Sequence, residues 1–144
     1  MSRKVLAVDD RTSGRDLIRA IFEHAGHLVF EASDEIETMR IAREVGPNLI
    51  LFDPYMPGFD GFRLLRILGQ DPTLRGALIV ALTASAMCGD RERMVSAGFD
   101  AYISKPVSPK SLRGEVEVLW GCQWPRPTGE QELLLAPYFS PVRM

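Results

Sequence analysis

Val5-Leu6-Ala7-Val8-Asp9-Asp10, close to the amino terminus, is a short apolar run that ends in two adjacent acidic residues. Four apolar residues are too few for a helix and are typical of a strand buried on both faces. Similar runs, rich in β-branched and aromatic residues, recur at residues 28–30, 49–52, 78–82 and 101–103. The sequence therefore predicts five buried strands, with an acidic pair where the first one ends.

Between these runs, apolar residues recur three and four positions apart, which is the spacing of one face of a helix. The residues on these faces are Leu17, Ile18, Ile21 and Phe22, then Ile36, Met39, Ile41 and Ala42, then Leu64, Leu65 and Leu68. Two further helices are predicted at residues 87–97 and 109–120. Strand and helix thus alternate five times, which indicates an α/β fold with a parallel sheet covered by helices on both faces.

Length and composition are those of one ordinary folded domain. The chain has 144 residues, of which 46% are hydrophobic and 25% are charged, a balance that favours neither disorder nor a fibrous protein. No apolar stretch is long enough for a signal peptide or a membrane span. With two cysteines and a net charge of -2, we expect a cytoplasmic protein that binds neither membranes nor nucleic acid directly.

Five polar side chains follow the predicted strands. Asp9 and Asp10 end the first strand, and Asp53 ends the third. Thr83 ends the fourth, and Lys105 comes soon after the fifth. In an open parallel sheet, ligands bind at the carboxyl ends of the strands, where successive helices lie on opposite faces. For the strand order 2-1-3-4-5 that point lies between the first and third strands, so the three aspartates are expected to converge there.

This convergence has an electrostatic cost. Two carboxylates about 4 Å apart repel by about 4 kcal/mol at an effective dielectric constant of about 20. A magnesium ion offsets the repulsion, because it prefers a few carboxylates, retained waters and phosphate oxygens. With the ion and the Lys105 ammonium drawing charge from an incoming phosphoryl group, an aspartate can act as the nucleophile. Thr83 offers a hydroxyl for one phosphoryl oxygen, and the small Ala84 leaves room beside it.

Together these residues resemble the response-regulator receiver domain of bacterial two-component signalling. The resemblance covers about residues 3–120 and depends on the joint order and spacing of several motifs. They are Asp9-Asp10, Asp53 followed by Met56-Pro57 and Asp60-Gly61, Thr83-Ala84, Tyr102 and Lys105-Pro106. The resemblance implies a doubly wound, flavodoxin-like three-layer sandwich of five strand–helix units, and a signalling protein that is not a turnover enzyme.

The resemblance also implies a role for each acidic residue. Asp53 resembles the phosphoacceptor, which takes its group from the phosphohistidine of a sensor histidine kinase or a phosphotransfer protein. Asp10 and Asp53, with the backbone carbonyl of Tyr55, resemble the ligands of Mg2+, and Asp9 acts largely through bound water.

The remaining site residues are implied to hold the phosphoryl group and to transmit its arrival. Lys105 and Thr83 resemble the residues that bind the phosphoryl oxygens, together with the backbone amide of Ala84. Thr83 then moves toward the phosphoryl group and the Tyr102 ring turns inward. This changes the face made by the fourth helix, the fifth strand and the fifth helix, where a downstream protein partner binds.

Two residues and the tail depart from the family pattern. Pro54 lacks a backbone N–H, but we expect phosphorylation to survive because the amides of Tyr55 and Ala84 make the phosphoryl contacts. Tyr55 is large at a position that governs attack by water on the acyl phosphate, and the sequence leaves the direction of its effect open. Residues 121–144 are apolar, interrupted by proline and too few for a separate output domain. We expect this tail to fold against the fifth helix of the receiver domain, residues 1–120, or against a second copy of the chain in a homodimer.

Three other functions match the sequence less well. A haloacid-dehalogenase-type phosphatase also uses an aspartate nucleophile and magnesium, but its first strand ends in Asp-x-Asp, whereas this one ends in Asp9-Asp10-Arg11. A phosphorylation-independent interaction module with the receiver fold is expected to lack a key residue, and none is missing. A flavin-binding protein needs a phosphate-cradling loop after the first strand, where Asp9 and Asp10 would repel phosphate.

Overall fold

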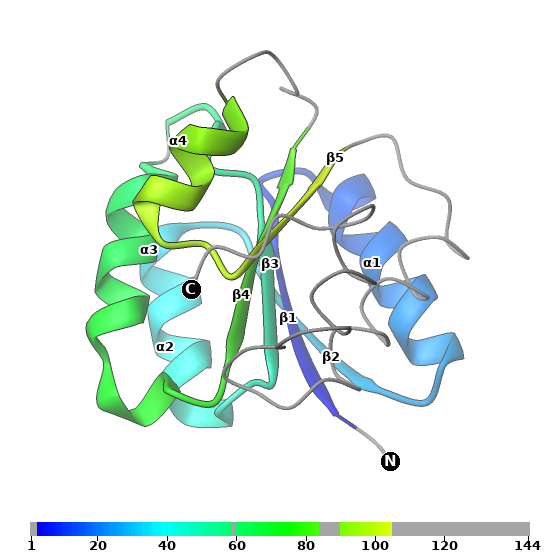
Figure 1. The fold of residues 1–144 in the computed structure, drawn as a ribbon. Coiled ribbons are helices and arrows are strands. Elements are labelled where there is room, and N and C mark those ends of the chain that lie inside the picture. Colours follow the sequence, from blue (N-terminus) through cyan, green and yellow to red (C-terminus); the bar gives the residue numbers. More distant parts are fainter. Residues whose placement is uncertain (1–2, 59, 84–89, 105–144) are drawn as a thin grey trace, which may run out of the picture.

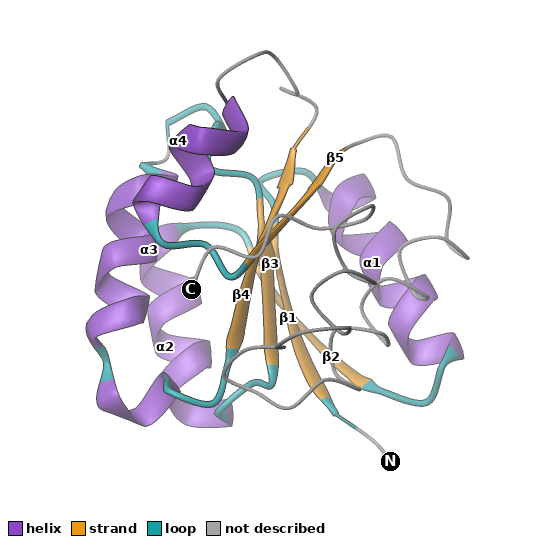
Figure 2. Cartoon of the chain, viewed as in Figure 1, coloured by secondary structure: helices purple, strands orange, loops and turns teal. Residues whose placement is uncertain are grey.

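The five predicted strands form one parallel sheet in the order β2-β1-β3-β4-β5 (Figures 1 and 2). The computed structural model describes residues 3–58, 60–83 and 90–104. The strands are β1 (Lys4–Val8), β2 (Leu28–Ala32), β3 (Leu49–Phe52), β4 (Leu78–Thr83) and β5 (Ala101–Ser104). The predicted strand order is confirmed, with β1 and β3 side by side.

Helices cover both faces of the sheet, as Figure 1 shows. One face carries α1 (Thr12–His24), and the other carries α2 (Glu35–Val45), α3 (Gly61–Gln70) and α4 (Asp90–Ala97). A short 3-10 helix, η1 (Pro72–Leu74), lies between α3 and β4. The predicted doubly wound, flavodoxin-like α/β fold is confirmed.

The strands are apolar throughout because they separate two hydrophobic layers. In β1, Val5 and Ala7 pack in a cluster with three buried residues of α1. The alternate residues Leu6 and Val8 belong to a second cluster, which includes residues of α2, α3 and α4. Since neither face of β1 meets solvent, the first polar residue after Val8 marks the edge of the sheet.

The helix α2 buries most of the face that its apolar spacing predicted, since Ala42 is buried and Met39 and Ile41 pack partly buried against the core, but Ile36 departs from it. Its buried residues are Thr38 and Ala42, whereas Ile36 is 83% exposed. Residues two positions apart lie on nearly opposite sides of a helix, so Ile36 and Thr38 cannot share a face. In α1, Leu17 is likewise 44% exposed, although the neighbouring Ile18 is buried.

Some predictions fall outside the described residues. The helix α4 is described from Asp90, so the predicted start of this helix at residue 87 is outside. The fifth helix at 109–120 and the tail at 121–144 are outside as well. Among the described ranges, no helix is long and apolar enough to cross a membrane.

Close backbone packing fixes the start of α3. Asp60 caps this helix by accepting a hydrogen bond from the Arg63 N–H at 3.0 Å. The next residue, Gly61, is buried, and a Cβ atom there would overlap the Pro54 Cα and lie 2.8 Å from the Pro54 carbonyl oxygen. Because backbone atoms cannot rotate away, the loop after β3 requires glycine at this position.

Gly61→Ala is therefore expected to lower the free energy of unfolding by about 1–3 kcal/mol, since α3 would have to move away from Pro54. Gly69, in the same helix, has no atom within 4 Å of an added Cβ. Gly69→Ala is expected to raise the free energy of unfolding by about 0.5–1 kcal/mol through helix propensity alone. Urea unfolding measures both, and a stabilised Gly61→Ala variant would contradict the close contact.

Asp71 organises the turn between α3 and η1. Its carboxylate accepts hydrogen bonds from the Thr73 hydroxyl at 2.7 Å and the Thr73 N–H at 3.0 Å. The Arg43 guanidinium lies 3.1 Å from the other carboxylate oxygen. The bonds from Thr73, followed by Arg43, hold the pKa of Asp71 below its ordinary value of 3.8.

A lowered pKa predicts how stability changes with pH. The folded chain favours the charged form of Asp71, so its stabilisation is fully present above pH 3.8 and is lost as the pH falls through the folded pKa. Asp71→Asn keeps a capping side chain but cannot ionise. The wild type is expected to be the more stable protein at neutral pH, and the difference in free energy of unfolding is expected to shrink in acid. Urea unfolding across acid and neutral pH checks this, and a constant difference would contradict it.

Candidate functional site

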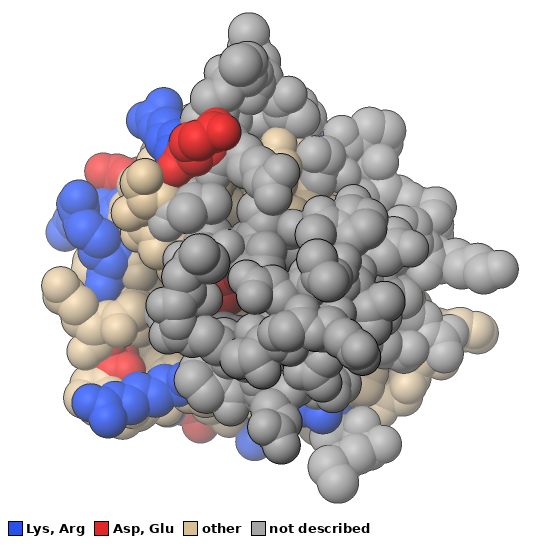
Figure 3. All heavy atoms as spheres, viewed as in Figure 1, with Lys and Arg blue, Asp and Glu red and all other residues tan. Residues whose placement is uncertain are grey.

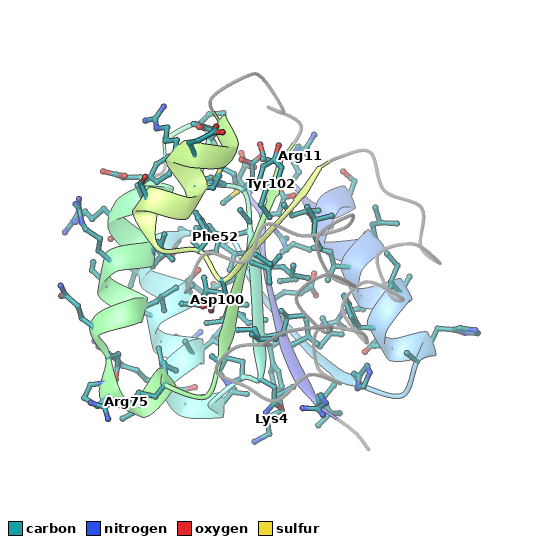
Figure 4. All side chains as sticks on the ribbon, viewed as in Figure 1. Lys4, Arg11, Phe52, Arg75, Asp100 and Tyr102 are labelled. Carbon is teal, nitrogen blue, oxygen red and sulfur yellow. The ribbon has the colours of Figure 1, made fainter. Side chains whose placement is uncertain are left out.

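The acidic residues lie where β1 and β3 end side by side. Val8 pairs with Phe52 in the parallel register, and Asp9 and Asp53 are the next residues along their chains. Neighbouring strands are about 4.7–4.9 Å apart, so two aspartates leave the sheet next to each other. Figure 4 shows Arg11 and Tyr102 at this same end of the sheet, opposite Lys4. The register of β1 and β3 therefore brings the aspartates to the same edge of the sheet, as the sequence predicted.

Asp9 is a buried residue whose side chain is fixed by the start of α1. It is 5% exposed, and its Oδ1 accepts a hydrogen bond from the Arg11 N–H at 2.9 Å. The Arg11 guanidinium lies 3.6 Å from the same oxygen. A Cβ atom at Gly14 would overlap the Asp9 Oδ2. The carboxylate therefore lies against helix backbone that has no room for a side chain.

Asp10 differs from its neighbour in its surroundings. Its residue is exposed at the start of the loop that leads into α1. Within the described part of the chain, its side chain makes no hydrogen bond or ion pair. One member of the acidic pair is thus anchored in the fold, and the other faces solvent.

Asp53 is half-buried in the turn that follows β3. Its Oδ1 accepts a hydrogen bond from the Tyr55 N–H at 2.8 Å, and its carbonyl oxygen accepts one from the Met56 N–H at 3.4 Å. The turn is also packed against α3 through the contact of Pro54 with Gly61. These contacts hold the carboxylate in one orientation at the edge of the sheet.

Thr83 and Tyr102 come from the two strands beyond β3. Thr83 is 1% exposed at the end of β4, and its Cα partner on β5 is Ser104. Tyr102 pairs with Ala81, one strand over, and packs partly buried against the cluster on the side of α3 and α4. The other predicted phosphate-binding residues, Ala84 and Lys105, lie outside the described residues.

An aromatic group connects the Asp53 turn to α4. The Tyr55 and Phe62 rings are 5.7 Å apart, and the Arg93 guanidinium lies 5.5 Å from the first ring and 4.8 Å from the second. Phe99 continues the group toward the core at 6.4 Å from Phe62. Contacts of this kind are favourable, because a cation is attracted to the face of an aromatic ring. The turn that carries Asp53 is thus in contact with the helix that precedes β5.

Sequence reasoning did not single out Gly14, Arg15 or Arg93. A glycine within the first turns of a helix lowers stability, so its presence at position 14 could have indicated that another group packs closely against the backbone there. The two arginines gave no such signal, because their partners lie on other elements of the fold.

Carboxylate oxygens suited to a metal ion are present at this edge. No three His, Cys, Asp or Glu side chains of residues 3–58, 60–83 and 90–104 are grouped as a metal site. Magnesium does not require such a group, since one or two carboxylates usually bind it together with waters and phosphate oxygens. Asp9, Asp10 and Asp53 offer hard oxygen ligands at adjacent strand ends, so the chemistry of this donor set fits Mg2+.

Comparison with known proteins assigns the family. Residues 5–117 match the family model of the response regulator receiver domain. The chain belongs to this family. The polar-differentiation response regulator DivK of Brucella ovis is 37% identical over 108 residues, which are 75% of this chain and 88% of DivK.

Solved receiver structures share the fold. The chemotaxis response regulator CheY4 of Vibrio cholerae is 26% identical with a TM-score of 0.75, covering 81% of this chain and 98% of CheY4. The receiver domain of the sensor histidine kinase PA1611 from Pseudomonas aeruginosa is 30% identical with a TM-score of 0.74. That match covers 84% of this chain and 99% of the PA1611 receiver domain, whose structure has a magnesium ion coordinated in the active site cleft.

The receiver assignment confirms the resemblance on which the sequence reasoning depended. The chain is a receiver-domain response regulator of the two-component type, and such proteins are signalling proteins, not turnover enzymes. Membership of this family therefore argues against a haloacid-dehalogenase-type phosphatase and against a flavin-binding protein.

The contact between Gly14 and Asp9 can be tested in the receiver domain itself. Helix propensity alone would make Gly14→Ala more stable by about 1 kcal/mol. Because the new methyl group would displace the Asp9 carboxylate, we expect no gain in the free energy of unfolding and a changed amide signal for Arg11. Urea unfolding and nuclear magnetic resonance measure the two effects. A variant that is stabilised as much as Gly69→Ala, with an unchanged Arg11 amide, would contradict the contact.

Proposed function

We propose that Asp53 is the phosphoacceptor of this receiver domain and takes its phosphoryl group from the phosphohistidine of a sensor histidine kinase or a phosphotransfer protein. The observation that carries the proposal is the register of β1 and β3, which puts Asp53 beside the Asp9-Asp10 pair. An isolated aspartate after a strand is usually a cap or a turn residue. Three aspartates at two adjacent strand ends repel one another. A bound cation would offset this repulsion, so the arrangement favours a site for a cation and a phosphoryl group.

The proposed step is an in-line displacement at phosphorus. A carboxylate oxygen of Asp53 forms a bond to phosphorus while the nitrogen–phosphorus bond of the phosphohistidine breaks, and its electron pair returns to the imidazole nitrogen. The Tyr55 N–H, 2.8 Å from Asp53 Oδ1, orients the carboxylate for this attack. The half-buried position of Asp53 limits how far the side chain can turn.

Asp10, Asp53 and the backbone carbonyl of Tyr55 would hold Mg2+ in this proposal, with Asp9 acting largely through bound water. The ion offsets the negative charge that accumulates when a phosphoryl group approaches the carboxylates. Asp9 is anchored by Arg11 and Gly14, so it provides a fixed negative charge beside the exposed Asp10.

Thr83, Ala84 and Lys105 are proposed to bind the phosphoryl oxygens. Thr83 and Tyr102 are proposed to form the switch, since they lie on neighbouring strands at the edge where the phosphoryl group would arrive. The proposed output face consists of α4, β5 and the fifth helix expected at residues 109–120. A downstream protein partner binds there, and the tail at residues 121–144 folds against the fifth helix or against a second copy of the chain.

The charges along the flank formed by α3 and α4 suit a protein partner better than direct binding of nucleic acid. In Figure 3, basic and acidic side chains lie side by side along the flank formed by α3 and α4. Nucleic acid would be matched by a patch of basic residues alone. A cytoplasmic location is proposed with this function, because that is where histidine kinases transfer their phosphoryl groups.

Phosphoryl uptake tests the proposal directly. The full chain is incubated with Mg2+ and acetyl phosphate or phosphoramidate, and its intact mass is measured. We expect the mass of one phosphoryl group to be added to the wild type and none to Asp53→Asn. Removal of Mg2+ with a chelator is expected to abolish the uptake.

Asp34→Asn is the matched control, because Asp34 is an exposed aspartate that caps α2 by accepting the Glu37 N–H at 2.7 Å. This variant is expected to take up one phosphoryl group like the wild type. Uptake that survives in Asp53→Asn would sink the proposal. No uptake by the wild type would favour a receiver fold that signals without phosphorylation.

A further inference from the structure

Arg15 connects the end of β1 to the edge strand β2. Its side chain is 17% exposed, and its Nη1 donates a hydrogen bond to the backbone carbonyl oxygen of Asp9 at 2.7 Å. Its Nε lies 3.3 Å from Glu31 Oε1 on β2, and its Nη2 lies 3.3 Å from the Thr12 hydroxyl. One guanidinium therefore joins β1, β2 and the first turn of α1.

The Glu31 partner is itself held in place. Arg19 approaches its second carboxylate oxygen at 2.8 Å, so Glu31 lies between two arginines of α1. Its side chain is 27% exposed, and a partly buried pair of this kind is screened less than a surface pair. The planar fork of Arg15 also loses little freedom when it makes several bonds at once. Arg15 is thus a rigid support for the carbonyl that it contacts.

The carbonyl of Asp9 belongs to the peptide unit that joins Asp9 to Asp10. A peptide unit is planar, so a bond that fixes its oxygen also fixes the direction in which the Asp10 backbone leaves. Asp10 depends on this support, because its side chain has no hydrogen bond or ion pair within the described residues. The side chain of Asp9 does not need it, since Arg11 and Gly14 already hold that carboxylate.

We propose that Arg15 is a positioning residue for the metal site, holding the Asp9–Asp10 peptide so that the Asp10 carboxylate faces the space beside Asp53. The inference rests on the proposed function, in which Asp10 is a ligand of Mg2+. In this proposal Arg15, which lies outside the acidic pair, controls the affinity for Mg2+ through its hydrogen bond to the Asp9 carbonyl oxygen.

The sign of the effect separates positioning from simple charge. A positive charge near a cation site repels the cation, so loss of the Arg15 charge by itself would raise the affinity for Mg2+. Loss of a supporting hydrogen bond lowers metal affinity, on the order of tenfold or more. A weaker affinity in Arg15→Gln therefore cannot be explained by the removed charge.

The experiment measures Mg2+ binding to the full chain by isothermal titration calorimetry, without a phosphodonor. Arg15→Gln is expected to weaken Mg2+ binding on the order of tenfold. Arg19→Gln is the matched control, because it removes the same charge and the other partner of Glu31 but makes no contact with Asp9. Its Mg2+ affinity is expected to stay within about twofold of the wild type.

A third variant and a second readout keep the proposal testable if Arg15→Gln folds poorly. Glutamine also carries an N–H donor, but its amide ends two bonds short of the arginine Nη atoms, whereas the longer Arg15→Lys side chain ends one bond short of them. The Mg2+ affinity of Arg15→Lys is therefore expected to lie between those of the wild type and Arg15→Gln. Thermal unfolding without Mg2+ reports the structural cost of each variant separately, and the amide signal of Asp10 reports the orientation of the peptide.

The outcomes are distinct. Equal or tighter Mg2+ binding in Arg15→Gln, or the same loss in Arg15→Gln and Arg19→Gln, would overturn the positioning role. A wild-type chain that binds no Mg2+ would instead overturn the proposed function on which the inference rests. Loss confined to the Arg15 variants, with a shifted Asp10 amide, would support it.

Discussion

The parallel pairing of β1 with β3 is the constraint on which the site depends. It needs both strands to be apolar on both faces, since α1 covers one side of the sheet and α2 to α4 cover the other. It also fixes the register Val8 to Phe52, from which the position of Asp9 beside Asp53 follows. Burial of the strands provides the free energy that holds like charges close together at their ends. A slip of this register would separate the charges that the core now keeps in place.

Much of this architecture was readable from the sequence, and the reason is physical. Strands buried on both faces must be apolar throughout, so runs such as Leu49–Phe52 stand out without any structural knowledge. Polar residues at their ends are visible for the same reason, which is why the Asp9-Asp10 pair and Asp53 were found. The buried residues of the helices were harder to predict, because a helix that packs on a sheet buries only a narrow stripe of its surface. Hydrophobicity predicted that Ile36 would be buried and Thr38 exposed, whereas in the structure Ile36 is exposed and Thr38 is buried.

The internal geometry of the site could not be predicted in the same way. Nothing in the sequence says that Asp9 is buried while the adjacent Asp10 is exposed. That difference arises from the turn into α1 and from the space that Gly14 leaves. Long-range partners are equally hidden, since Asp100 receives its hydrogen bond from the Ile79 N–H, 21 positions away along the chain (Figure 4). Periodicity describes elements, whereas contacts between elements require the folded register.

The Arg93 contact with Tyr55 and Phe62 makes α4 and the Asp53 turn parts of one thermodynamic system. An exposed contact of this kind is worth about 0.5–1 kcal/mol, enough to change the ratio of two conformations about two- to fivefold. Whatever moves α4 off the rings must supply that free energy. Whatever tightens the rings around Arg93 makes α4 harder to move, because coupling between two sites is reciprocal. The contact of Arg93 with two rings thereby couples α4 to the Asp53 turn by the same free energy, whichever of the two moves first.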